Sequence, residues 1–221
     1  MFPLTNVLTE MLNFKNIPRY HLPFLLLIVL FSARTTAADT LLILGDSLSA
    51  GYHLPVEQSW PVLMDKKWQK SGNNITVING SISGNTAAQG LERLPELLKQ
   101  HKPRWVLIEL GANDGLRGFP PQQTEQDLQQ IITLVKQANI QPLLMQIRLP
   151  PNYGRRYTES FARIYPKLAE HNQIPLLPFY MEQVAIKPEW VQQDGLHPNL
   201  AAQPFIADWI SDILLVHLNH S

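Results

Sequence analysis

Residues 40–52 read TLLILGDSLSAGY, and this segment indicates the fold class. It begins with an almost uninterrupted apolar run and turns at Gly45 into a short polar loop. A short apolar run that ends at a turn residue is typical of a β-strand covered on both faces of a parallel sheet. Later runs repeat this pattern, and we expect further strands at residues 75–79, 104–110, 142–147 and 174–177.

Longer amphipathic stretches lie between these apolar runs. Their apolar residues recur three or four positions apart, which is typical of helices that bury one face. Residues 86–89 read TAAQ, a capping-box pattern that marks the start of a helix. The alternation predicts one α/β domain around a central parallel sheet of about five strands. We expect its helices at residues 59–69, 86–99, 124–138, 157–170 and 201–217.

The overall composition excludes several classes of site. The chain has 221 residues and no cysteine, so disulfides, a cysteine nucleophile and thiolate metal ligands are ruled out. Lys and Arg together number 18, as do Asp and Glu, so the formal net charge is zero. No basic patch indicates a nucleic-acid partner. Because 45% of the residues are hydrophobic, the chain can bury a full core.

The N-terminal segment has the features of a secretory signal. Lys15 and Arg19 precede an apolar run at residues 22–31, and the small residues that follow it include Ala37. A positive flank, a short apolar centre and a small-residue end are typical of a signal peptide. The apolar run is too short for a comfortable membrane span, which takes about 20 residues.

We therefore expect a signal peptide over residues 1–37, cleavage after Ala37, and an exported domain over residues 38–221. An uncleaved N-terminal anchor is the alternative. Met11 lies at a better distance from the apolar run than Met1 does, so it is a second candidate for the start of the chain.

Polar residues and glycines directly after the predicted strands are the candidate functional groups, because ligands of parallel sheets bind at the carboxyl ends of the strands. Ser47 follows the first strand within Gly-Asp-Ser, but a serine needs a base before it becomes a nucleophile. Gly84, after the second strand, can present its N–H to an anion. Asn113, after the third, can donate from its side chain. Taken singly, Ser47 is better explained as a helix cap and Asn113 as part of a turn, and Gly84 is uninformative.

The last of these loops, residues 193–198, reads QDGLHP and places Asp194 three positions before His197. The carboxylate can accept the Nδ1–H of the imidazole and leave Nε2 as a base. A solvated acid beside a helix-flanking histidine is one alternative, and a metal-binding pair is another. No HExxH pattern supports a metal site.

In chain order, the four loops carry Gly-Asp-Ser, Gly, Gly-x-Asn-Asp and Asp-x-x-His. This pattern resembles the SGNH/GDSL hydrolase family, whose four naming residues match Ser47, Gly84, Asn113 and His197. The resemblance extends over residues 38–217 and is strongest to the bacterial periplasmic members. It implies a three-layer α/β/α, flavodoxin-like fold and a periplasmic location.

The resemblance also implies a role for each of these residues. Ser47 is the expected nucleophile, His197 its base, and Asp194 the residue that orients the base. The backbone N–H groups of Ser47 and Gly84 and the side chain of Asn113 are the expected oxyanion hole. The resemblance implies no cofactor and no metal.

The expected reaction is the hydrolysis of acyl esters and thioesters through an acyl-enzyme on Ser47. Acyl-CoA, aryl esters and lysophospholipids are the substrate classes that the resemblance implies. A carbohydrate O-deacetylase on the same fold and a non-enzymatic exported binding protein are the alternatives. We expect small-molecule substrates, no nucleic acid, no stable membrane span and a monomer.

Two loops flank the expected mouth of the site, at residues 115–121 and 149–156. Their apolar residues are candidates for the wall of an acyl groove, although packing under their own loops explains them equally well. The candidates are Leu116, Phe119, Leu149 and Tyr153.

Overall fold

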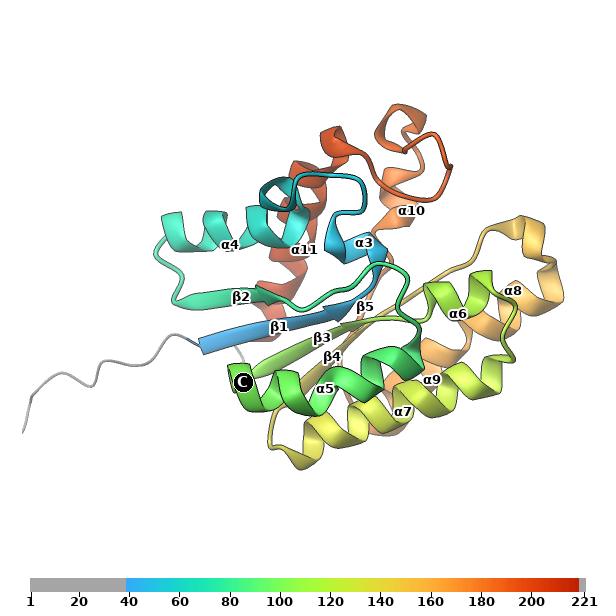
Figure 1. Cartoon of the computed structure of the whole chain (residues 1–221), viewed down its shortest axis with the longest axis horizontal. Coiled ribbons are helices and arrows are strands. Elements are labelled where there is room, and N and C mark those ends of the chain that lie inside the picture. The colour runs from blue at the N-terminus through green and yellow to red at the C-terminus, as the bar shows by residue number, and fades with distance from the viewer. Residues whose placement is uncertain (1–38, 219–221) are drawn as a thin grey trace, which may run out of the picture. The chain divides into compact units, whose positions relative to one another are not determined.

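The computed structural model describes residues 39–218, in which five parallel strands form a central sheet (Figure 1). All neighbouring pairs are parallel, so the carboxyl ends of the strands lie at one edge of the sheet. The predicted parallel sheet is therefore confirmed. In spatial order the strands are β2 (Ile75–Asn79), β1 (Asp39–Gly45), β3 (Trp105–Glu109), β4 (Gln141–Met145) and β5 (Leu176–Leu177).

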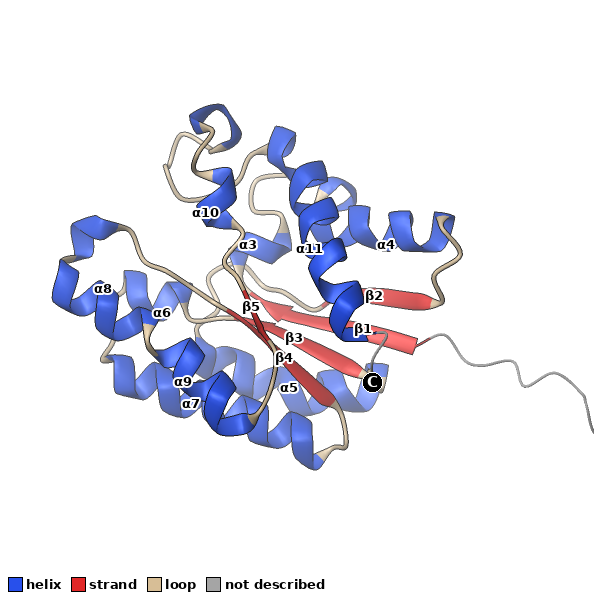
Figure 2. Ribbon diagram, turned by 180° about the vertical axis from the view of Figure 1, so that it is seen from behind, coloured by secondary structure: helices blue, strands red, loops and turns tan. Residues whose placement is uncertain are grey.

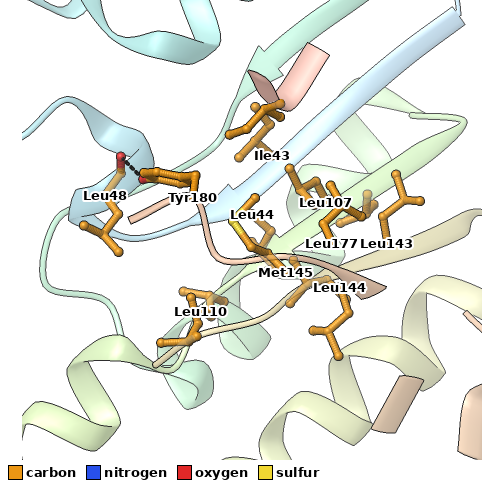
Figure 3. Packing of buried hydrophobic residues seen from close by; sticks show 14 of the residues in the cluster. Ile43, Leu44, Leu48, Leu107, Leu110, Leu143, Leu144, Met145, Leu177 and Tyr180 are labelled. Carbon is orange, nitrogen blue, oxygen red and sulfur yellow. Dashed lines mark hydrogen bonds between the residues drawn. The ribbon is translucent and has the colours of Figure 1, made fainter. Parts of the chain in front are cut away.

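The centre of the sheet is buried on both faces, as the apolar strands predict. Residues 41–44 of β1 and all five residues of β3 are buried. Figure 3 shows side chains of β1, such as Leu44, close to those of β3 and β4, such as Leu107 and Leu144. Each fully buried aliphatic side chain stabilises the fold by about 1.5–3 kcal/mol relative to an exposed one. This core holds the carboxyl edge of the sheet in place.

Long helices cover both faces of the sheet and give the predicted three layers (Figure 2). On one face lie α4 (Trp60–Lys70) and α11 (Gln203–Leu218). On the other lie α5 (Ala87–His101), α7 (Pro121–Gln137) and α9 (Ile164–Asn172). The capping box predicted at the start of α5 is present, with Thr86 as the N-cap and Gln89 as its partner.

Short elements connect the strands to these helices. The strand order and the two helical layers match the flavodoxin-like arrangement, so the predicted fold class is confirmed. The short helices are α3 (Ser47–Ala50), α6 (Ala112–Leu116), α8 (Arg155–Ala162) and α10 (Met181–Val184). The 3₁₀ turns are η2 (Val56–Gln58), η3 (Pro151–Tyr153), η4 (Pro188–Trp190) and η5 (Leu200–Ala202).

One predicted helix is wrong in its extent, because residues 157–170 belong to two helices, α8 and α9, that meet at Arg163. Pro166 has no N–H to donate to the carbonyl of Ala162, which a continuous helix would require. The side chain of Gln146 donates to that carbonyl instead, at 3.1 Å. Pro166 and the side chain of Gln146, the residue after β4, therefore divide the helix.

The predicted signal peptide, residues 1–37, lies outside the described residues and stays a prediction. Within residues 39–218, no helix combines the length and the apolar character that crossing a bilayer requires.

Candidate active site

The loops that follow the strands bring the predicted site residues to the carboxyl edge of the sheet. Ser47 is the first residue of α3, separated from the end of β1 by Asp46 alone. Asn113 lies in α6, which follows β3, and Gly84 lies in the loop between β2 and α5. His197 comes from the loop before η5, 150 positions after Ser47 in the sequence. The fold thus collects residues from all four motifs.

Ser47, His197 and Asp194 form a continuous chain of hydrogen bonds. Nε2 of His197 lies 2.8 Å from Oγ of Ser47, and Nδ1 of His197 lies 2.6 Å from Oδ2 of Asp194. In this geometry Nδ1 donates to the carboxylate and Nε2 accepts the serine proton. The ring of Tyr52 lies against the imidazole, with 4.4 Å between the ring centroids. The imidazole is therefore held by a carboxylate at one nitrogen and by an aromatic ring.

The carboxylate of Asp194 is shaped by its own loop. Oδ1 accepts the backbone N–H of Leu196 at 2.9 Å and that of His197 at 3.0 Å, which leaves Oδ2 for the imidazole. Burial would raise the pKa of Asp194, but these N–H donors and His197 outweigh it and lower the pKa below its ordinary value. Asp194 therefore stays ionised, as a partner of an imidazolium must.

The three candidate oxyanion donors lie around the same edge. The N–H of Ser47 opens α3, so it has no acceptor within the helix. Gly84 has a φ of +82°, in the left-handed region that favours glycine, and its N–H has no hydrogen-bond partner among residues 39–218. The side-chain nitrogen of Asn113 donates to Asp46 and to the carbonyl of Asn85. Asn85 is the neighbour of Gly84, so the second and third motifs are in direct contact.

Two carboxyl groups lie buried beneath the nucleophile turn, Gly45-Asp46-Ser47. Asp46 accepts the backbone N–H of Leu48 at 3.0 Å, and Glu109, at the end of β3, accepts the hydroxyl of Ser49 at 2.6 Å. Burial raises the pKa of Asp46 to about 7, although the hydrogen bonds from Leu48 and Asn113 oppose this shift. Burial and the charge of Asp46 raise the pKa of Glu109 well above its ordinary range. Sequence reasoning missed Glu109, which lies inside an apolar strand.

A cavity of about 450 Å³ opens beside Ser47, Asn113 and His197. Its wall is mostly apolar, with the charged pair of Arg148 and Glu182, 2.7 Å apart, as an exception. The apolar lining comprises Leu48, Ala112, Leu116, Leu149, Pro150, Pro151, Phe179, Met181, Ala185 and Leu196. The site thus joins a nucleophile and base to a cavity that suits an apolar chain.

Two of the four predicted groove residues line this cavity and two do not. Leu116 and Leu149 contribute to the wall, whereas Phe119 and Tyr153 lie outside it. The hydroxyl of Tyr153 donates to the carbonyl of Leu116 at 3.1 Å, and this hydrogen bond stabilises the segment that carries Leu116. Sequence reasoning missed the segment 179–185, although it follows the last strand and the rule for strand ends indicates it.

The geometry of the described residues gives no sign of a metal centre, since no three His, Asp or Glu side chains of residues 39–218 gather in a metal-binding group.

Comparison with known families matches residues 43–203 to the GDSL-like lipase/acylhydrolase family. The chain belongs to this family. The match covers all four motifs, from the nucleophile turn to His197.

Individual relatives agree with this assignment. The chain is 63% identical over 210 residues to an Escherichia coli K12 protein named thioesterase 1/protease 1/lysophospholipase L1, covering 95% of this chain and 99% of that protein. It is 55% identical over 197 residues to a Vibrio mimicus arylesterase, covering 88% and 98% respectively. A crystal structure of the esterase EstA from Pseudoalteromonas, inhibited by monoethylphosphonate, superposes with a TM-score of 0.80 at 44% identity, covering 82% of this chain and 99% of EstA. The predicted family and its reaction class, ester and thioester hydrolysis, are confirmed.

Proposed function

We propose that this hydrolase transfers the acyl group of an ester or thioester to Ser47 and then to water. The observation that carries the proposal is the 2.8 Å contact between Nε2 of His197 and Oγ of Ser47, at the mouth of an apolar cavity. A serine beside an oriented histidine is an activated nucleophile, and the cavity supplies a place for the acyl chain.

The reaction follows from the chain of hydrogen bonds. Nε2 of His197 takes the proton of Ser47 while Oγ attacks the carbonyl carbon, and Asp194 stabilises the imidazolium that forms. His197 then gives the proton to the leaving alcohol or thiol, which departs and leaves an acyl-enzyme. Water, activated by the same nitrogen, releases the carboxylic acid and restores Ser47.

The negative oxygen of the tetrahedral intermediate needs donors in the proposed oxyanion hole. The N–H groups of Ser47 and Gly84 have no competing acceptor among the described residues, so they are ready to bind an anion. Asn113 is the third donor, and it gives up a hydrogen bond to Asp46 or Asn85 when it turns to the oxyanion.

The cavity favours acyl chains of medium or long length over acetyl. Its volume of about 450 Å³ and its lining by leucine, phenylalanine and methionine fit an extended alkyl chain. Lysophospholipids, acyl-CoA thioesters and aryl esters share such an acyl group with different leaving groups. The name of the E. coli relative includes thioesterase and lysophospholipase, and the Vibrio relative is named arylesterase. An enzyme exported to the periplasm does not meet cytosolic acyl-CoA, so a lysophospholipid or another ester is the proposed substrate there.

This location depends on the N-terminal segment. In the proposal residues 1–37 direct export and cleavage after Ala37 releases the enzyme into the periplasm. Mass spectrometry of the protein from a periplasmic fraction tests it directly. A mature N-terminus at Ala38 supports cleavage there, whereas an intact chain from Met1 or Met11 contradicts it.

The experiment that tests the proposed function is a chain-length series. Residues 38–221 are expressed, and hydrolysis of p-nitrophenyl esters from two to sixteen carbons is compared with that of Ser47→Ala. The variant should lose on the order of 10⁶ in kcat, because the nucleophile is gone. A Ser47-dependent rate that peaks at medium or long chains supports the proposal. A rate confined to acetyl indicates the deacetylase, and no rate indicates a binding protein.

A further inference from the structure

Arg93 contacts the two loops that carry the proposed oxyanion donors. It lies on α5, the helix that follows the Gly84 loop, and it belongs to none of the four motifs. Its guanidinium donates through Nε to Oδ1 of Asn85 at 2.8 Å and through Nη2 to the carbonyl of Gly45 at 3.2 Å. Nη1 donates to the carbonyl of Gly80. One side chain thus joins the ends of β1 and β2 to the turn beside Gly84.

The chemistry of arginine suits this task. The guanidinium is a rigid plane whose donors point in fixed directions, so three bound oxygens are held at fixed mutual distances. Arg93 is half-buried, and its acceptors are two backbone carbonyls and one amide oxygen, with no carboxylate from residues 39–218 in contact with it. A half-buried guanidinium loses part of its hydration, and three neutral oxygens compensate for this loss less well than a carboxylate would. Its contacts therefore favour a role in geometry.

The contacts of Arg93 lead directly to the oxyanion donors. Gly45 lies two residues before Ser47, and its carbonyl also accepts the N–H of Ile82 at 3.1 Å. Asn85 is the next residue after Gly84, and its own carbonyl accepts the side-chain nitrogen of Asn113 at 3.0 Å. Each of the three donors is therefore close to a residue that Arg93 binds. Ser47 lies two residues after Gly45, and Gly84 is the residue before Asn85. Asn113 is hydrogen-bonded to Asn85.

We propose that Arg93 is a positioning residue that sets the distance between the Ser47 and Gly84 amides, and through Asn85 the place of the Asn113 side chain. The inference rests on the proposed function, since it concerns the same oxyanion hole. Arg93 does not line the cavity beside Ser47, so we expect its effect on the transition state and not on the binding of the ester.

The test compares Arg93→Ala with Lys99→Ala, which removes an exposed charge from the same helix. With a p-nitrophenyl ester, Arg93→Ala should lower kcat about 10- to 100-fold with KM within about twofold, because the donors are displaced and not removed. The Ki of an alkyl boronic acid, which forms a tetrahedral anion on the serine, should rise by the same factor as kcat/KM falls. Lys99→Ala should leave all three values unchanged.

An unchanged kcat in Arg93→Ala overturns the inference, and so does a loss of kcat with an unchanged boronic acid Ki. If thermal unfolding shows that Arg93→Ala does not fold, Arg93→Lys decides. Lysine keeps the charge but cannot hold three oxygens in one plane, so a folded lysine variant should still lose kcat, and full activity overturns the inference. A rate that depends on Ser47 but not on Arg93 overturns this inference alone, whereas a rate independent of Ser47 overturns the proposed function with it.

Discussion

The side-chain nitrogen of Asn113 donates to Oδ2 of Asp46 across 3.1 Å, so the proposed oxyanion donor is bonded to the residue next to the proposed nucleophile. The other hydrogen of the same nitrogen goes to the carbonyl of Asn85, at 3.0 Å. Both hydrogens of the amide are therefore engaged, and the oxyanion must compete for one of them. This arrangement fixes the amide before substrate binds and ties its orientation to Asp46.

The Asn113→Ala variant should lose roughly 10²–10³ in kcat with little change in KM, since the lost hydrogen bond strengthens only as the oxyanion forms. Steady-state kinetics with a p-nitrophenyl ester measure both constants. A rise in KM with an unchanged kcat would instead mean that Asn113 binds the ester in its ground state.

Protonation of Asp46 should make the stability of the fold depend on pH. Burial raises the pKa of Asp46 from 3.8 to about 7, so between these values the folded protein holds a proton that the unfolded chain has released. The stability that this group contributes is complete below pH 3.8 and is lost as pH rises through about 7. The change amounts to about 4 kcal/mol at most.

The Asp46→Asn variant tests this effect, because it keeps the shape and removes the titration of Asp46. It also removes the charge that helps to raise the pKa of Glu109, so the variant reports on both carboxyl groups. Urea unfolding between pH 4 and pH 8 should give a free energy of unfolding that falls more steeply for the unmodified enzyme than for the variant. Parallel curves would show that Asp46 titrates near its unfolded value. The comparison uses the slope of the unfolding free energy against pH and not its absolute value. The absolute value also changes, because an asparagine at position 46 alters the hydrogen bond to the Asn113 amide.

The Asp194→Asn variant should lose about 10⁴ in kcat while the fold is kept. Oδ1 of Asp194 accepts two backbone N–H groups, so the oxygen of an asparagine must stay there and its nitrogen must face Nδ1 of His197. That nitrogen donates, which forces the hydrogen of the imidazole onto Nε2 and leaves no base for Ser47. Kinetics and circular dichroism check the two halves of the prediction, and near-normal kcat would contradict the role of Asp194.

Leu149→Ala should shift the preferred chain length of the ester series upward. Leu149 is 9% exposed, lines the cavity, and packs so closely on Gly115 that a Cβ there would meet its Cδ2 at 2.4 Å. Shortening it enlarges the cavity beside Ser47 without changing the backbone. Leu200→Ala is the matched control, since Leu200 is 45% exposed and lies outside the cavity wall. The same profile for both variants would count against Leu149 as an acyl contact.

The sequence alone was enough for the fold class and the four motifs, because both depend on local patterns. In the first three motifs, an apolar strand, the glycine that ends it and the functional residue lie in one short segment, as in Gly45-Asp46-Ser47. Asp194 and His197 are likewise only three residues apart. Strand and turn preferences act over such short distances, and the topology of parallel sheets then places every strand end at the same edge.

Which other side chains reach that edge depends on the three-dimensional packing of the chain. Arg93 meets Gly45 across 48 positions, and Phe179 joins a cavity wall with Leu48 and Leu116 from other parts of the chain. In the sequence, Glu109 is a single charged residue within an apolar strand. The structure shows that it accepts a hydrogen bond from Ser49. Such contacts depend on how a helix lies on the sheet and how far each side chain extends, and these are set by the packing of the whole core.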